Sequence, residues 1–143
     1  MIYFFYNIDL LITLDRCGLV KPIIDNGCKI IISEFRISYY SLEKQTLINR
    51  MIGAGIVDLV DDGADALDFA ETHSSYMSHI GKGGLLVIHL CVTNSCVMVI
   101  EDEFQFYREI AANFGVNSVS PADFFRQNIE DTQRREFLMN VFK

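Results

Sequence analysis

The sequence lacks several features that would place it in a well-defined class of protein. It has no tryptophan, only two prolines, and no Cys-x-x-Cys pair among its four cysteines. Because proline is scarce and no low-complexity run occurs, nothing marks a linker between domains. Without paired cysteines the sequence favours neither a zinc site nor a disulfide framework. Small buried thiols in a reducing compartment explain the cysteines better.

Long apolar runs and excess positive charge are also missing. No run reaches the roughly 18 apolar residues that a membrane span needs. The apolar N-terminus has no basic region, and Asn7 and Asp9 interrupt it. We therefore expect a cytoplasmic protein with no membrane segment. With 12 Lys and Arg against 19 Asp and Glu, the net charge is −7. This balance argues against broad electrostatic capture of nucleic acid and suits a basic protein partner.

Half of the residues are hydrophobic, and they are arranged in alternating patterns. Short continuous apolar runs predict buried strands, and apolar residues at intervals of three or four predict helices. The predicted strands are residues 2–6, 29–32, 56–60, 96–100 and 116–119, and helices are predicted over 34–51, 85–92, 104–114 and from 121. This order predicts a three-layer α/β/α sandwich with a central, mainly parallel sheet. We assign residues 1–126 to the domain and 127–143 to a C-terminal helical tail.

An acidic cluster, Glu101-Asp102-Glu103, directly follows the predicted strand 96–100. Open α/β sheets bind ligands outside the carboxyl ends of their strands, and clustered carboxylates are the ligands that Mg²⁺ prefers. The cluster therefore predicts a site. An equally good interpretation is a solvated turn whose acids stabilise the start of the next helix. Asp9 has the same two interpretations, a metal ligand or a helix cap.

A glycine-rich segment, Gly81-Lys82-Gly83-Gly84, precedes the predicted helix 85–92. Such a segment could cradle a phosphate at a helix N-terminus. It lacks the full P-loop signature, so a simple turn is preferred. A flavodoxin-like nucleotide-binding protein would need a glycine-rich loop after the first strand, and residues 7–14 contain no glycine.

The motifs between Ile2 and Phe125 together resemble the PIN domain, the small α/β fold of VapC-type toxin ribonucleases. Residues 7–12 are similar to the opening Asp-Thr-Asn-x-Leu-Ile motif of that family, and residues 30–33 to its strand followed by a capped helix. The other similar segments are 79–84 (the glycine turn), 101–111 (Asp-Asp … Arg-x-x-Ala), and Val116 with 120–125 (the closing strand and short helix).

The resemblance implies a nuclease, specifically a divalent-metal-dependent ribonuclease in which Mg²⁺ or Mn²⁺ activates water. Asp102 and Asp9 would then be catalytic and hold the metal, Glu103 would assist them, and Asn7 would orient water or complete the coordination. The resemblance also implies an RNA substrate, an antitoxin partner and a homodimer.

This sequence departs from the pattern of the family at the acidic positions. Asn7 and Gly84 stand where the family has acids, and Tyr40-Ser41 stands where it has the glutamate of the second helix, with Glu43 displaced. The alternative is therefore a catalytically inactive PIN-like binding protein. It could be an immunity protein, an antitoxin-like protein or a regulatory protein. Such a protein would use its acidic surface to bind a basic protein partner.

Overall fold

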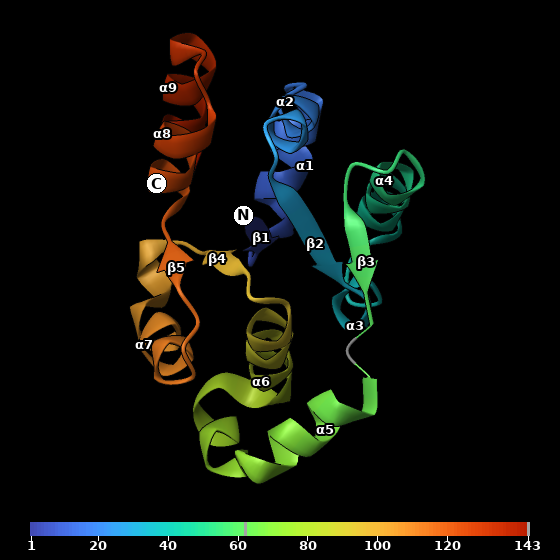
Figure 1. Cartoon of the computed structure of the whole chain (residues 1–143), viewed down its shortest axis with the longest axis vertical. Helices are drawn as coiled ribbons and strands as arrows, with labels where there is room; N and C mark the ends of the chain where they lie inside the picture. The colour runs from blue at the N-terminus through green and yellow to red at the C-terminus, as the bar shows by residue number, and fades with distance from the viewer. Residues whose placement is uncertain (62, 143) are drawn as a thin grey trace.

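A computed structural model of the chain describes residues 1–61 and 63–142. Within these residues, five strands form a central sheet with helices on both faces (Figure 1). The strands are β1 (Ile2–Phe5), β2 (Lys29–Ser33), β3 (Asp58–Val60), β4 (Val97–Val99) and β5 (Ser118–Val119). The helices are α1 (Ile8–Arg16), α2 (Val20–Asp25), α3 (Glu34–Ile37), α4 (Leu42–Gly53), α5 (Gly63–Thr72), α6 (Met77–Asn94), α7 (Gln105–Asn113), α8 (Pro121–Asn128) and α9 (Thr132–Val141). Two 3-10 turns, Ser74–Tyr76 and Asp102–Phe104, precede α6 and α7.

The sheet has the strand order β3-β2-β1-β4-β5, and every neighbouring pair is parallel. The chain therefore builds outward from β1 to β3 on one side and then returns to build from β4 to β5 on the other. The direction of winding changes between β1 and β4, where open α/β folds place their ligand sites. The predicted parallel sheet is confirmed, and all of its strands are parallel.

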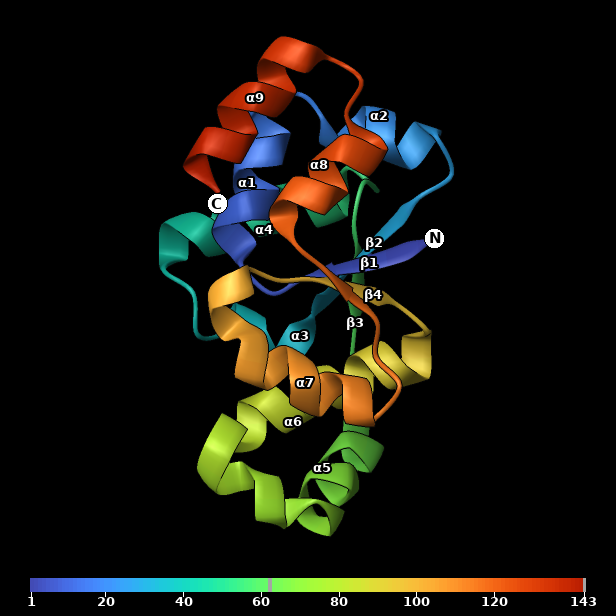
Figure 2. The same cartoon turned by 90° about the vertical axis from the view of Figure 1, so that its left-hand side faces the viewer.

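Helices form a layer on each face of the sheet. One layer consists of α1, α2, α4, α8 and α9, and α5, α6 and α7 lie on the opposite side (Figures 1 and 2). Side chains of β1 alternate between the layers: Tyr3 and Phe5 face the first, and Phe4 faces the second. Such alternation is the period of a strand. It explains why β1 is apolar at every position.

The ring of Phe124 fixes α8 on the first layer. Its centroid lies 4.9 Å from that of Tyr3 and 5.0 Å from that of Phe5, both in edge-to-face geometry. Ser120 caps α8 by accepting a hydrogen bond from the Asp123 N–H, and Pro121 occupies the first helical turn, as the sequence predicts. The tail adds α9, which packs onto the same layer through the buried Leu138.

The helix predicted over residues 34–51 is wrong in its continuity, because the structure divides it into α3 and α4. The break lies at residues 38–41, where Ser41 adopts extended backbone and its hydroxyl accepts a hydrogen bond from the Lys44 N–H. A serine in that position starts a new helix rather than continuing an old one. Arg36 on α3 and Tyr40 within the break both line a pocket at the end of β1.

The loop predicted at residues 81–84 is also wrong, because α6 runs through this segment. Only Gly81 departs from helical geometry, with φ 74° and ψ 167°, and it kinks the helix. A glycine is needed there because other residues rarely adopt positive φ. Helical structure resumes at Lys82, so the glycine-rich segment forms the start of the second half of α6.

None of the helices in the described part of the chain is both long and apolar enough to cross a membrane.

Candidate functional site

The candidate site lies at the carboxyl ends of β1 and β4, where the winding of the sheet changes. Phe5 of β1 pairs with Val99 of β4, and the Tyr6 N–H donates a hydrogen bond to the Val99 carbonyl at 3.0 Å. Two residues beyond this pair, each strand ends in a polar side chain, Asn7 on one and Glu101 on the other. The parallel register therefore brings together two side chains that are 94 positions apart in the sequence.

Asn7 uses both ends of its side-chain amide. Its Oδ1 accepts a hydrogen bond from the Asp9 N–H at 2.9 Å and thereby caps α1. Its Nδ2 donates to Oε1 of Glu101 at 2.9 Å. Because the backbone donor fixes which end of the amide is oxygen, the NH₂ group must face the carboxylate. Asn7 thus presents a donor to Glu101 and offers no second oxygen ligand beside it.

Glu101 is the buried carboxylate of the site, with 7% of its surface exposed. Its Oε1 is bonded to Asn7, and no described residue hydrogen-bonds its Oε2, which is also buried. A buried acceptor without a partner destabilises the protein unless a water molecule or a ligand satisfies it. Glu101 is therefore held in place at one oxygen and available at the other.

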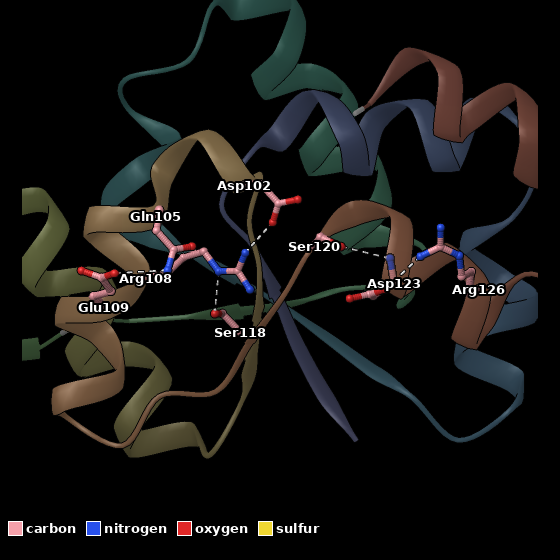
Figure 3. A network of polar contacts seen from close by, with 8 residues as sticks. All are labelled: Asp102, Gln105, Arg108, Glu109, Ser118, Ser120, Asp123 and Arg126. Carbon is pink, nitrogen blue, oxygen red and sulfur yellow. Dashed lines mark hydrogen bonds and ion pairs between the residues drawn. The ribbon is translucent and has the colours of Figure 1, made fainter.

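Asp9 and Asp102, the two residues predicted to be catalytic and to hold the metal, have different cationic partners. Asp9 is exposed, and its Oδ1 pairs with Nζ of Lys44 at 2.8 Å. Oδ1 of Asp102 lies 2.6 Å from Nη1 of Arg108, whose Nε donates to the Ser118 hydroxyl at 3.0 Å. Figure 3 shows Asp102 and Ser118 converging on Arg108. Asp102 thereby connects the turn after β4 to α7 and β5.

A pocket of about 530 Å³ opens over Asn7 and Glu101. Of the predicted site residues, Asn7 and Glu103 line it, and Glu103 is exposed. Its lining also contains two cations, Arg36 and Lys44, and the rings of Tyr6 and Tyr40. Burial raises the pKa of the Tyr40 hydroxyl, and the charges of Arg36 and Lys44 oppose that shift. The pocket is therefore mixed in charge, with two cations and two carboxylates in its lining.

This donor set does not fit a divalent metal ion. Mg²⁺ and Mn²⁺ require several oxygen ligands, mainly carboxylates. The pocket offers one buried carboxylate and one exposed carboxylate, and the Asn7 amide directs its NH₂ group at the buried one. Among the described residues, no group of three or more His, Cys, Asp or Glu side chains lies close enough to hold a metal.

Packing explains why a glycine occupies position 84, where the resemblance places an acid. A Cβ on Gly84 would lie 3.1 Å from Cε2 of Tyr107 and 3.2 Å from Cβ of Ile80. The Tyr107 hydroxyl also donates a hydrogen bond to the Gly84 carbonyl at 2.7 Å. Burial holds the pKa of Tyr107 well above its usual range. A side chain at position 84 would therefore crowd the ring of Tyr107 and the side chain of Ile80.

Sequence reasoning selected Asp102 from the acidic cluster and passed over Glu101, which is the buried member. The signal that could have identified Glu101 is register: Asn7 and Glu101 both stand two residues after paired strand ends. Arg36, Tyr40 and Lys44 were also missed as lining residues. Tyr40 lies in the break between α3 and α4, where the sequence predicted one continuous helix, and Arg36 lies on α3 just before the break.

Comparison with known proteins supports the fold. No protein-family profile and no curated protein matches the sequence. One similar solved structure is the "Crystal structure of VapBC2 from Rickettsia felis bound to a DNA fragment from their promoter", with a TM-score of 0.53 and 14% identity. The likeness covers 84% of this chain and 98% of that chain. At this level of identity it establishes the fold alone. The chain has a three-layer α/β/α fold of the PIN-like type.

Proposed function

We propose that this chain is a PIN-like protein that binds a protein partner in a toxin–antitoxin-type pair. In this proposal it carries out no metal-dependent catalysis. The observation that carries the proposal is the hydrogen bond from Asn7 Nδ2 to Glu101 Oε1 at 2.9 Å. This bond supplies a donor to the buried carboxylate where metal chemistry would need a second carboxylate. The fold likeness to a toxin–antitoxin complex supports the biological setting.

Charge distribution supports a basic protein as the partner. Residues 51–81 contain six acidic residues and no lysine or arginine. Asp65, Asp68 and Glu71 are exposed on α5, which lies at the end of the molecule away from α8 and α9 (Figure 1). Exposed like charges of this kind increase the association rate with a partner of opposite charge, and salt screens the effect.

The decisive experiment is an RNA cleavage assay with the purified chain in Mg²⁺ and in Mn²⁺. We expect no cleavage above that of a Glu101→Gln variant. Metal-dependent cleavage by the wild-type protein that Glu101→Gln or Asp102→Asn abolishes, with the variant still folded, would contradict the proposal. It would instead support the alternative function, a ribonuclease that uses Mg²⁺ or Mn²⁺ at Asp9, Asp102, Glu103 and Asn7.

The partner-binding half of the proposal is tested separately in the native host. We expect the tagged chain to be recovered with a basic protein in a complex that weakens as salt rises. The double charge reversal Asp65→Lys and Asp68→Lys should weaken that complex, because both side chains are exposed on α5. A matched double reversal in the opposite layer, Asp25→Lys on α2 with Glu136→Lys on α9, should leave it intact. If neither salt nor the double reversal at Asp65 and Asp68 weakens the complex, the acidic face is not the binding surface.

A further inference from the structure

A second pocket, of about 540 Å³, adjoins the first and shares Tyr6, Arg36 and Tyr40 with it. It lies between α3 and the start of the second half of α6. Its own lining residues are Phe35, Tyr39, Val87 and the segment from Lys82 to Gly84. Glu101 and Glu103 line the first pocket and are absent from the lining of this one. The charged side chains that line the second pocket are thus both cations, Arg36 and Lys82.

Arg36 carries the buried polar atom of this pocket that lacks a hydrogen-bond partner among the described residues. Its guanidinium carbon lies 4.9 Å from the ring centroid of Tyr6 and 5.7 Å from that of Phe4. Its Nη1 is buried and has no hydrogen-bond partner among the described residues, and no described carboxylate forms an ion pair with Arg36. Stacking on aromatic rings orients a guanidinium but satisfies none of its N–H donors. A buried donor on a full charge therefore remains available at the wall of a pocket.

Two further features add positive potential around Arg36. Lys82 lines the pocket and is exposed. Helical geometry resumes at Lys82 after the kink at Gly81, so the residues of the first turn, Gly83 and Gly84, line the pocket at the positive end of a helix. Because both are glycines, the backbone itself forms this part of the wall. Two side-chain charges and the helix end match a doubly charged anion better than a single carboxylate.

The remaining wall is aromatic. The rings of Phe35 and Tyr39 lie 5.2 Å apart at an interplanar angle of 56°, and Tyr39 is 73% exposed. An exposed aromatic ring at a pocket with cations is the arrangement on which planar rings of ligands stack. The volume is within the range of sites that hold small organic ligands. It exceeds what a bare phosphate ion would fill.

We propose that this pocket binds a nucleoside monophosphate, with the phosphate between Arg36 and Lys82 and the base against Phe35 and Tyr39. Arg36 and Lys82, the charged side chains that line this pocket, favour a phosphate monoester, and the size and aromatic wall favour a nucleotide over inorganic phosphate. The nucleotide pocket goes beyond the proposed function. Cleavage and partner binding are measured without nucleotide, so a failure of either proposal is distinguishable from a failure of the other.

The test is isothermal titration of the 143-residue chain with adenosine, guanosine, cytidine and uridine 5′-monophosphates. We expect saturable binding of at least one nucleotide, with inorganic phosphate and the matching nucleoside each at least about tenfold weaker. Lys82→Met and Arg36→Met should each weaken binding by about tenfold or more, because each removes a charged donor and keeps an apolar stem. Lys21→Met, a charge-matched change on α2 in the opposite layer, should leave binding unchanged.

Three results would overturn the proposal. One is the absence of saturable binding by any of the four nucleotides up to about 10 mM. Another is binding that neither Lys82→Met nor Arg36→Met weakens. The third is an affinity for inorganic phosphate or for a phosphotyrosine peptide that equals or exceeds the affinity for every nucleotide. If Arg36→Met does not fold, Lys82→Met together with Tyr39→Ala decides the question, because both of these side chains are exposed.

Discussion

Asn7→Asp tests the central feature of the candidate site, because it changes one hydrogen-bond donor into a negative charge. The cap of α1 should survive, since aspartate caps helices as well as asparagine does. The bond from Nδ2 to Glu101 Oε1 at 2.9 Å is lost, and two carboxylates then face each other where Glu101 is only 7% exposed. Losing a bond to a charged group and gaining a like-charge contact should together cost about 2–4 kcal/mol at neutral pH.

Urea denaturation of the wild type and the variant, without metal, measures this cost. The deficit should shrink in acid, because protonating one carboxyl group removes the repulsion. The matched control is the double variant Asn7→Asp with Glu101→Gln, which restores a donor and a carboxylate in exchanged positions. We expect it to recover most of the lost stability, so that the double-mutant cycle shows strong coupling between the two positions. A double variant no more stable than the sum of its single changes would refute the reasoning.

Mn²⁺ provides a second measurement on the same variants. The single variant Asn7→Asp has two facing carboxylates, and metal at about a hundred times its dissociation constant should add about 2.7 kcal/mol to the stability. The wild type and the exchanged double variant should not respond, because each has only one carboxylate at this pair of positions. An equal, saturable rise in melting temperature for the wild type would show that the amide does not prevent metal binding.

Three further predictions test the packing and the charges around the site. Tyr107→Phe should cost about 1 kcal/mol through its lost bond to the Gly84 carbonyl. Because burial raises the pKa of Tyr107, its contribution is complete below about pH 10 and is lost as pH rises through the higher folded-state value, so alkaline melting curves of the variant should show a smaller loss. Phe124→Ala should cost about 3–5 kcal/mol in urea, because Phe124 is fully buried against Tyr3 and Phe5. Asp9→Asn should cost less than about 1 kcal/mol, because its pair with Lys44 is exposed and screened by water, and thermal melting with and without salt checks this.

The layers and the sheet could be predicted from sequence because local patterns determine them. The apolar run of Ile2 to Phe5 requires burial on two faces, and Ser120 followed by Pro121 marks a helix start wherever it occurs. The division of the helix 34–51 was missed for the same local reason. Ser41 can either cap a helix or continue one, and periodicity of the apolar residues across it favoured continuation.

The pairing within the site could not be read from local patterns. Whether Glu101 or Asp102 turns inward depends on how β4 pairs with β1 and on Arg108, which binds Asp102 from the next helix. Likewise, nothing in the sequence near Arg36 indicates that it would stack on Tyr6. These contacts join residues far apart in the chain, so register and packing decide them.

Gly84, where the resemblance to PIN domains places an acid, shows that several elements together distinguish this site from a metal-binding site. An acid there would place its Cβ 3.1 Å from the ring of Tyr107 and 3.2 Å from Ile80, and Tyr107 is buried and bonded to the same residue. A side chain at position 84 would therefore require Tyr107 and Ile80 to shift from their present positions. Asn7→Asp alone can restore one carboxylate beside Glu101, but a further acid from α6 would also require Tyr107 of α7 and Ile80 to shift. The pocket is thus stabilised in its present form by the packing of the core beneath it as well as by the polar residues that line it.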